Sequence, residues 1–284
     1  QQEQQQQRKV VGGVGAAAEE PQEAKRSSKR ASRKSARAPK AAMAVARWDY
    51  SECGPEQWAE TWEAAAKGTR QSPIDFLVAD APLPAGADAD AQGDAAAPRI
   101  TLRDARAALL NNSLTIMANV TEGGTTVEID GRFYDLLQFH FHSPSEHTFD
   151  GAQHDLELHL VHKARDGQGD GPALAVVGIL FKLGEANAFL DGLFDRATSE
   201  PFDLPEPVTF EGLRLDGPAF TYAGSLTTPP CTEGVAWTVL RDLHTLSQDQ
   251  LDAFRKQIPF DNYRPVQPLN DRLVHSCHCL ATAE

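Results

Sequence analysis

Six of the nine histidines fall within one short stretch of the chain, between Gln138 and His162. Imidazole side chains bind metals and transfer protons near neutral pH, so this stretch is where the sequence could carry chemistry. Three neutral imidazoles with a fourth position left open are typical of a catalytic zinc site. Closed structural sites usually contain cysteines, and no cysteine lies within the stretch.

The residues that lead up to His142 alternate as they would in a β-strand. Side chains on a strand point to alternate faces, so Gln138, His140 and His142 share one face. Leu137 and two phenylalanines share the other face, which we expect to pack on the core. Taken alone, a His-x-His pair on a strand is more often a polar face than a pair of ligands, so further evidence is needed.

A second predicted strand, residues 156–162, offers the third histidine. Its leucines and His162 share the face that we expect to meet the core, whereas His159 faces away from it. If the two strands lie side by side, His159 converges with the histidine pair of the first strand, and His162 does not. His147 and His154 lie between the strands in a segment rich in Ser, Pro, Asp and Gly, where we expect surface positions.

Metal-bound histidines need an acceptor for the second ring nitrogen. Gln138 lies two residues before His140, and Glu157 lies two residues before His159. We therefore predict that the Gln138 amide and the Glu157 carboxylate hold these two rings. Because Glu157 lies two residues before His159, metal binding explains the histidines better than a polar strand face without a ligand does.

Strands must supply most of the frame that positions these side chains. Period-two apolar patterns rich in β-branched and aromatic residues predict strands over residues 126–142, 156–163, 174–183, 221–230 and 235–240. Helical patterns are few, and they cover Pro55–Lys67 and Ser247–Ile258, the second with Ser247 as N-cap. The sequence therefore predicts one mostly β domain with peripheral helices, of the α+β class, and no internal repeat.

Charge divides the chain into two parts. Residues 1–47 contain 11 Lys and Arg against 4 Asp and Glu, whereas residues 48–284 contain 16 against 36. The acidic body argues against nucleic acid as a partner, because phosphates bind to basic surfaces. No stretch approaches the ~18 consecutive apolar residues of a transmembrane helix.

Composition also suggests the domain boundaries. Residues 1–47 read as a disordered, basic, low-complexity segment, and its part from Lys25 to Arg47 has no acid and resembles either a transit peptide or a basic tail. The folded domain is predicted to cover 48–274, with a Pro-, Gly- and Asp-rich surface loop at 79–98. Residues 275–284, which contain Cys277 and Cys279, are predicted to be an exposed tail.

Several motifs, in one order along the chain, resemble the α-class carbonic anhydrases. The resemblance runs from about Trp48 to Arg272. It implies a central, largely antiparallel, twisted β-sheet, with one zinc ion per chain bound by the three histidines at the base of a conical cleft. The matching segments are 48–50, 54–58, 70–75, 138–142, 145–148, 157–161, 224–230 and 262–265.

The resemblance also implies a reaction and roles for further residues. Zinc makes its bound water a nucleophile, and the resulting hydroxide attacks CO2 to give bicarbonate and a proton. Thr227 would accept the hydrogen bond of the hydroxide and donate one to Glu146. Without the resemblance, Thr227 would be read as a turn residue before two prolines.

Apolar CO2 needs an apolar pocket beside the metal. The matching pocket positions are Val161, Val176, Leu226, Thr228, Val235 and Trp237. Tyr50 and Asn112 match positions that order water in the cleft, and Asn262 and Arg264 match a mainly structural motif.

One position departs from the family pattern. Efficient members carry Asn-Asn-Gly-His, in which the histidine passes the proton to buffer, and here the run ends in Ser113 and Leu114. Leu114 cannot carry a proton, so the sequence predicts impaired internal proton transfer. A catalytically weak carbonic-anhydrase-like binding module therefore stays an alternative, and so does an acidic protein of a matrix or mineral.

The four cysteines bear on the compartment. By resemblance to extracytoplasmic members of the family, Cys53 and Cys231 are predicted to form a disulfide that steadies the Thr227 loop. Two free buried thiols are the alternative. A disulfide implies an oxidising compartment, either outside the cell or in an organelle lumen such as that of the chloroplast or thylakoid. The protein is predicted to be a monomer, unless Cys277 or Cys279 links two chains.

Overall fold

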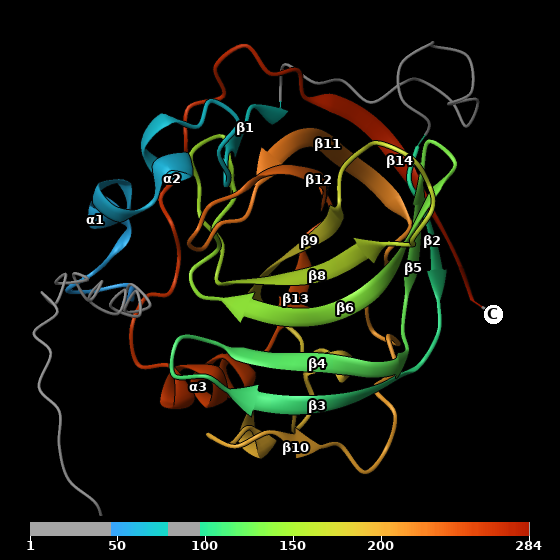
Figure 1. Ribbon diagram of the computed structural model, residues 1–284. Coiled ribbons are helices and arrows are strands. Elements are labelled where there is room, and N and C mark those ends of the chain that lie inside the picture. The colour runs from blue at the N-terminus through green and yellow to red at the C-terminus, as the bar shows by residue number, and fades with distance from the viewer. Residues whose placement is uncertain (1–46, 79–96, 284) are drawn as a thin grey trace, which may run out of the picture. The chain divides into compact units, whose positions relative to one another are not determined.

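The computed structural model describes residues 47–78 and 97–283, and strands dominate this part of the chain (Figure 1). The basic segment at 1–46 and most of the predicted loop at 79–98 lie outside the described residues. Among the described helices, none is both long and apolar enough to cross a membrane.

Most strands join one 12-stranded sheet, ordered β10-β3-β4-β6-β5-β2-β14-β11-β12-β9-β13, with β8 between β6 and β9. Its members are β2 (Arg99–Leu102), β3 (Ala105–Asn111), β4 (Ile116–Gly123), β5 (Thr126–Ile129), β6 (Arg132–His142), β8 (Leu156–Ala164), β9 (Leu174–Leu183), β10 (Phe202–Asp203), β11 (Gly217–Ser225), β12 (Glu233–Leu240), β13 (His244–Leu246) and β14 (His275–Ala283). The short strands β1 (Asp75–Phe76) and β7 (Thr148–Phe149) form a separate parallel pair.

The sheet curls until it meets itself. Because β8 pairs with both β6 and β9, the strands β6, β5, β2, β14, β11, β12, β9 and β8 form a closed ring of neighbours (Figure 1). Most pairs are antiparallel, and β9 with β12, β9 with β13 and β14 with β2 are parallel. The predicted mostly β, largely antiparallel architecture is confirmed.

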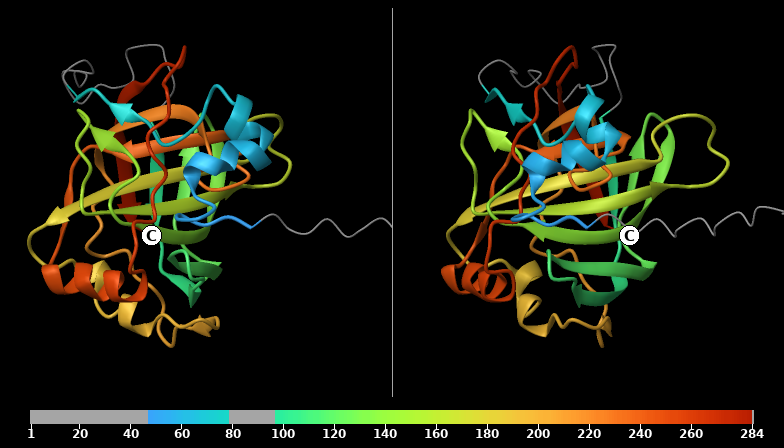
Figure 2. Two further views of the ribbon diagram at one scale, coloured as in Figure 1. Left: turned by 90° about the vertical axis from the view of Figure 1, so that its left-hand side faces the viewer. Right: turned by 60° about the vertical axis from the view of Figure 1, so that its left-hand side comes forward.

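The helices lie at the periphery, as predicted (Figure 2). The pattern at 55–67 forms two helices, α1 (Pro55–Thr61) and α2 (Glu63–Lys67), because Trp62 between them has an extended backbone. The pattern at 247–258 forms α3 (Gln248–Gln257), with Ser247 as N-cap in a complete capping box. Two short 3-10 helices are η3 (Ala188–Leu190) and η4 (Phe194–Arg196).

The strand that carries the first histidines follows the predicted alternation only in part. Phe139 and Phe141 are fully buried, but Leu137 is 46% exposed and Leu136 only 5%. The pairing of β6 with β8 shifts register between Leu136 and Gln138. The irregularity turns Leu137 outward, so its predicted place on the phenylalanine face is wrong.

The predicted exposed tail at 275–284 is also wrong for residues 275–283. They form β14, which pairs with β11 on one side and β2 on the other. Cys277 is 8% exposed and Cys279 0%. Since these thiols lie in the core, they are not exposed for the suggested link between two chains.

The predicted Cys53–Cys231 disulfide is absent from the structure, in which all four cysteines are free thiols. The backbone N–H group of each of these two cysteines is hydrogen-bonded within its own loop. The Cys53 N–H donates to Asp49 Oδ1 (2.8 Å), and the Cys231 N–H donates to the Thr228 carbonyl (2.9 Å). The alternative of free thiols describes this structure.

Asn262 ties the segment after α3 to the first histidine strand. Its buried side chain donates to the carbonyls of Leu114 (2.9 Å) and Phe141 (3.0 Å). Its Oδ1 accepts from the Ser143 N–H at 2.8 Å. The end of β6 is therefore held at a fixed place against the segment that follows α3.

Replacing this amide should weaken the whole domain. We expect Asn262→Ala to lower the free energy of unfolding by about 3 kcal/mol, because three hydrogen bonds of a buried group are lost together. Urea unfolding followed by tryptophan fluorescence measures the change. Asn270→Ala is the matched control, since that exposed amide donates to the Thr69 carbonyl alone among the described residues. Equal effects of the two substitutions would contradict the prediction.

Candidate metal centre

The pairing of β6 with β8 brings the three predicted histidines together. His140 lies directly opposite His159, and His142 lies opposite Glu157. The three rings lie with centroids 4.7 to 5.1 Å apart, and one nitrogen of each lies within 4.8 Å of the others. Strand alternation therefore places these side chains as the sequence predicted.

The second nitrogen of each ring has a hydrogen-bond acceptor. His140 Nδ1 lies 2.8 Å from Gln138 Oε1, and His159 Nε2 lies 2.7 Å from Glu157 Oε1. His142 Nδ1 lies 2.6 Å from the carbonyl oxygen of Asn262. With the protons on these nitrogens, the lone pairs of His140 Nε2, His142 Nε2 and His159 Nδ1 face the common centre.

These lone pairs fit a cation. Burial, and then the neighbouring imidazoles, lowers the pKa of His140 well below its usual value and that of His142 to about 3, and burial lowers the pKa of His159. All three rings are thus neutral at pH 7, as metal ligands must be. His159 Nδ1 and His140 Nε2 are 3.3 Å apart with no proton left to share, and buried His142 Nε2 has no hydrogen-bond partner. A zinc ion would satisfy all three atoms.

Glu157 is a buried carboxylate with four donors. Its Oε1 lies 2.6 Å from His147 Nδ1 and 2.7 Å from His159 Nε2. Its Oε2 accepts from the backbone N–H groups of Glu146 and His147, both at 2.8 Å. Burial alone would raise the pKa of Glu157, but the two histidines outweigh it and lower the pKa well below its usual range.

Glu146 lies at the edge of the histidine cluster. Its Oε1 accepts from the Arg264 N–H at 2.9 Å, and the Thr227 hydroxyl donates to the same carboxyl group. Its Oε2 is buried without a hydrogen-bond partner and lies 3.4 Å from His142 Nε2. Burial, and next the Glu157 charge, raises the pKa of Glu146 well above its usual value. A cation among the histidines would favour its ionised form.

The predicted pocket residues lie beside these groups. Val161, Val176, Val235 and Trp237 belong to one buried cluster, and Leu226 packs against it. The Trp237 ring lies 4.9 Å from the His159 ring. Thr228 is half-buried in the same loop as Thr227. An apolar wall therefore stands next to the metal-facing histidines.

The two predicted water-ordering residues differ in their surroundings. Tyr50 packs edge-on against Trp58, and burial, followed by the Glu146 charge, raises the pKa of Tyr50 well above its usual value. Asn112 is exposed, and its Oδ1 accepts from the N–H groups of Leu114 (2.9 Å) and Thr115 (2.8 Å). The amide oxygen of Asn112 thus shapes its own turn.

The sequence missed two contributors to this centre. His147 was expected at the surface, but it is fully buried between Glu157 and the Tyr222 phenol oxygen, 2.7 Å from His147 Nε2. Asn262 was assigned a structural role only, yet its carbonyl oxygen orients His142. A carbonyl 120 residues away from its partner leaves no sequence signal. The one clue in the sequence to the buried place of His147 was that a buried Glu157 carboxylate would need hydrogen-bond donors in addition to His159.

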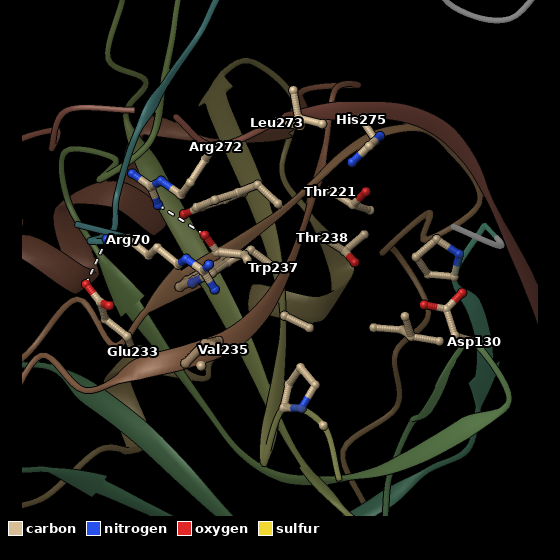
Figure 3. A pocket seen from close by; sticks show the side chains of 18 of the residues that line it. Arg70, Asp130, Thr221, Glu233, Val235, Trp237, Thr238, Arg272, Leu273 and His275 are labelled. Carbon is tan, nitrogen blue, oxygen red and sulfur yellow. Dashed lines mark hydrogen bonds between the residues drawn. The ribbon is translucent and has the colours of Figure 1, made fainter. Parts of the chain in front are cut away.

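A cavity of about 1200 Å³ lies beside β11, β12 and β14 (Figure 3). It shares Val235 and Trp237 with the apolar wall, and Arg70, Thr221 and His275 also line it. None of the three metal-facing histidines lines this cavity, so it is distinct from the candidate metal centre.

Comparison with known proteins identifies the family of this chain. A family model of eukaryotic-type carbonic anhydrase matches residues 53–278. Alpha carbonic anhydrase 7 of Arabidopsis thaliana is 36% identical over 239 residues, covering 79% of this chain and 81% of that protein. A carbonic anhydrase of Nostoc sp. is 37% identical over 240 residues, covering 80% and 84%.

A solved structure also matches, that of the α-carbonic anhydrase from Thermovibrio ammonificans in complex with the inhibitor sulfanilamide. It is 35% identical, with a TM-score of 0.72, and the match covers 82% of this chain and 100% of that chain. The fold, the motifs and these likenesses agree, and the chain belongs to the α-class carbonic anhydrase family, whose members interconvert CO2 and bicarbonate.

Proposed function

We propose that this chain is a zinc-dependent carbonic anhydrase, with His140, His142 and His159 as the metal ligands. The observation that carries the proposal is the meeting of three neutral imidazole lone pairs beside a buried carboxyl oxygen that has no donor. When bound, a zinc ion supplies the Lewis acidity that makes water a nucleophile at neutral pH. CO2, water and bicarbonate are the small-molecule partners.

Thr227 and Glu146 would orient the attacking oxygen. Because the Thr227 hydroxyl donates its proton to Glu146, its oxygen can only accept a hydrogen bond from the nucleophile. The Arg264 N–H and the Thr227 hydroxyl hold the Glu146 carboxyl in place. A lone pair of the nucleophile is then directed toward CO2, which would rest on the apolar wall of Val161, Val176, Leu226, Val235 and Trp237, with Thr228 near the substrate.

Removal of the metal tests the proposed function directly. We expect a strong zinc chelator to abolish CO2 hydration, and one equivalent of zinc per chain to restore it, as measured by stopped flow with a pH indicator. His140→Ala should bind zinc far more weakly, because one of three protein ligands is lost. His278→Ala, an exposed histidine on β14, is the control. If the zinc-loaded protein shows no turnover at any buffer concentration, the binding-module alternative replaces the enzyme.

Thr227→Val should separate orientation from metal binding. We expect kcat/KM to fall roughly 100-fold, as for the loss of one preorganised hydrogen-bonding group in other active sites. The zinc content should stay at the wild-type level, because Thr227 lies outside the three-histidine set. Thr121→Val on β4 is the matched control, since that exposed hydroxyl donates to the Arg106 carbonyl. Wild-type activity in Thr227→Val would overturn the proposed role.

We also propose that internal proton transfer is impaired. Leu114 is half-buried, and its carbonyl accepts from Asn262, whose own carbonyl holds His142. The backbone of residue 114 is therefore linked to the centre through Asn262, and its side chain has no group that titrates. External buffer would have to accept the proton instead.

The substitution Leu114→His tests this impairment. We expect wild-type turnover to climb with imidazole buffer at fixed pH and ionic strength. Leu114→His should raise turnover at low buffer about 10-fold or more, because a positioned imidazole transfers protons efficiently. Leu114→Gln, which fills similar space without titrating, is the control. Turnover that is independent of buffer in the wild type would show that another group carries the proton.

Compartment and oligomeric state stay predictions. The Cys53–Cys231 disulfide is not formed in the structure, so the oxidising, extracytoplasmic compartment that it implies stays a prediction, as does the transit-peptide interpretation of the acid-free segment from Lys25 to Arg47. The chain is expected to be a monomer.

A further inference from the structure

The cavity of Figure 3 lies at one end of the closed ring of strands, where β11 ends and β12 and β14 begin. Pro98, Ile129 and Asp130 line it as well. The mouths of β-barrels are common places for small-molecule sites, which have volumes of ~300–1,000 Å³. A cavity of about 1200 Å³ is therefore large enough for a small molecule.

A row of three polar side chains crosses the strands inside this cavity. Thr221 on β11 is the register partner of Thr238 on β12 and of His275 on β14. Residues directly opposite each other point to the same face of a sheet, and all three line the cavity (Figure 3). The row lies on the core-facing side, because Ala219, two residues along the same face of β11, belongs to the largest core cluster.

Burial increases along both strands from the entrance of the cavity to the polar row. On β11, Ala223 is exposed and Thr221 is half-buried. On β12, Ala236 is half-buried and Thr238 is fully buried. The two alanines are register partners and share the face of the threonines, so both sides of the entrance carry small side chains. An open entrance thus leads to hydroxyl groups that lie on top of the apolar core.

The Thr238 hydroxyl points to a ligand. Thr238 is 0% exposed, and its Oγ1 has no hydrogen-bond partner in the part of the chain that the structure describes. A buried hydroxyl without a partner destabilises a fold, and valine would fill the same space without that cost. A hydroxyl in this position, at the floor of a cavity, is suited to a hydrogen bond with a bound molecule.

The charges around the polar row favour an uncharged ligand. Residues 48–284 contain 16 Lys and Arg against 36 Asp and Glu, and Asp130 lines the cavity, so anions are repelled. Arg272 also lines the cavity, but its guanidinium lies over the Tyr222 ring, 5.5 Å from the centroid. Tyr222 alternates with Thr221 on β11, so this guanidinium belongs to the other face of the strand.

We propose that this cavity binds a small uncharged alcohol with an apolar body. The ligand hydroxyl would meet the hydroxyls of Thr238 and Thr221, each of which can both donate and accept a hydrogen bond. The apolar body would lie against the entrance alanines and against Pro98 and Ile129. None of the metal-facing histidines lines the cavity, so the inference does not depend on the proposed function.

Fluorine NMR of the full-length, zinc-loaded protein tests the site with two probes. Trifluoromethylcyclohexanol has the required hydroxyl group, and trifluoromethylcyclohexane lacks it. We expect Thr238→Val to weaken binding of the alcohol about 10-fold, as for one lost hydrogen bond, and to leave binding of the hydrocarbon unchanged. Ala236→Leu should abolish binding of both probes because it fills the entrance. Ala186→Leu, at an exposed position that does not line the cavity, is the matched control.

Stability separates a role in binding from a role in the fold. Because the Thr238 hydroxyl has no partner, Thr238→Val should unfold at the same urea concentration as the wild type or at a higher one. Saturating alcohol should leave CO2 hydration unchanged, since the sheet separates Thr238 from the histidines. No binding by the wild type, equal alcohol affinity in Thr238→Val, or inhibition of CO2 hydration by the alcohol would overturn the site.

A second measurement needs no variant and decides the matter if the substitutions unfold the chain. A crystal structure of the wild type with the alcohol reports where the probe lies. We expect its oxygen within hydrogen-bond distance of the Thr238 and Thr221 hydroxyls. Ordered water alone in the cavity, or alcohol bound only at the histidines, would refute the proposal.

Discussion

The structure around the candidate metal centre depends on one buried carboxylate, that of Glu157. Removing an ionised carboxylate from water costs several kcal/mol unless donors replace the lost hydration. Here four N–H groups do so, from the rings of His147 and His159 and from the backbone of Glu146 and His147. The same contacts that satisfy the charge fix the ring of His159 and the chain at Glu146. Loss of any one donor would leave part of this buried charge without a hydrogen bond, which is costly.

This constraint extends to the neighbouring strand. Gly178 lies opposite His159 on β9, and a side chain added there would come within 3.2 Å of Glu157 Oε1 and 3.7 Å of the Trp237 ring. The glycine therefore gives space to the carboxylate and to the apolar wall at once. The ionic part of the site and its apolar pocket are built against the same backbone position, so neither can shift without the other.

Much of the site could be predicted because strands repeat every two residues. Alternation placed His140, His142 and His159 on one side, and it placed Gln138 and Glu157 within reach of their partners, since residues two apart share a face. It failed for Leu137, where a local register shift breaks the repeat. It could not reach His147, which is positioned by a loop, nor the Asn262 carbonyl, because contacts between distant backbone segments have no periodic signature. The strand β14 was missed because its ladder partners, not its own composition, make it a strand.

The same alternation separates two kinds of ligand chemistry. On β6 and β8 it directs His140, His142 and His159 away from the phenylalanines and leucines of the main core, and on β14 it directs thiols into that core. Imidazole nitrogens suit zinc, whereas thiolates bind softer ions more tightly and would compete for any metal that both could reach. Because the sheet lies between the two sets, no single ion can take ligands from both. The alternation of side chains along the strands therefore keeps the thiols away from the histidine site. A one-residue slip in β14 would turn Cys277 and Cys279 outward and abolish the buried pair.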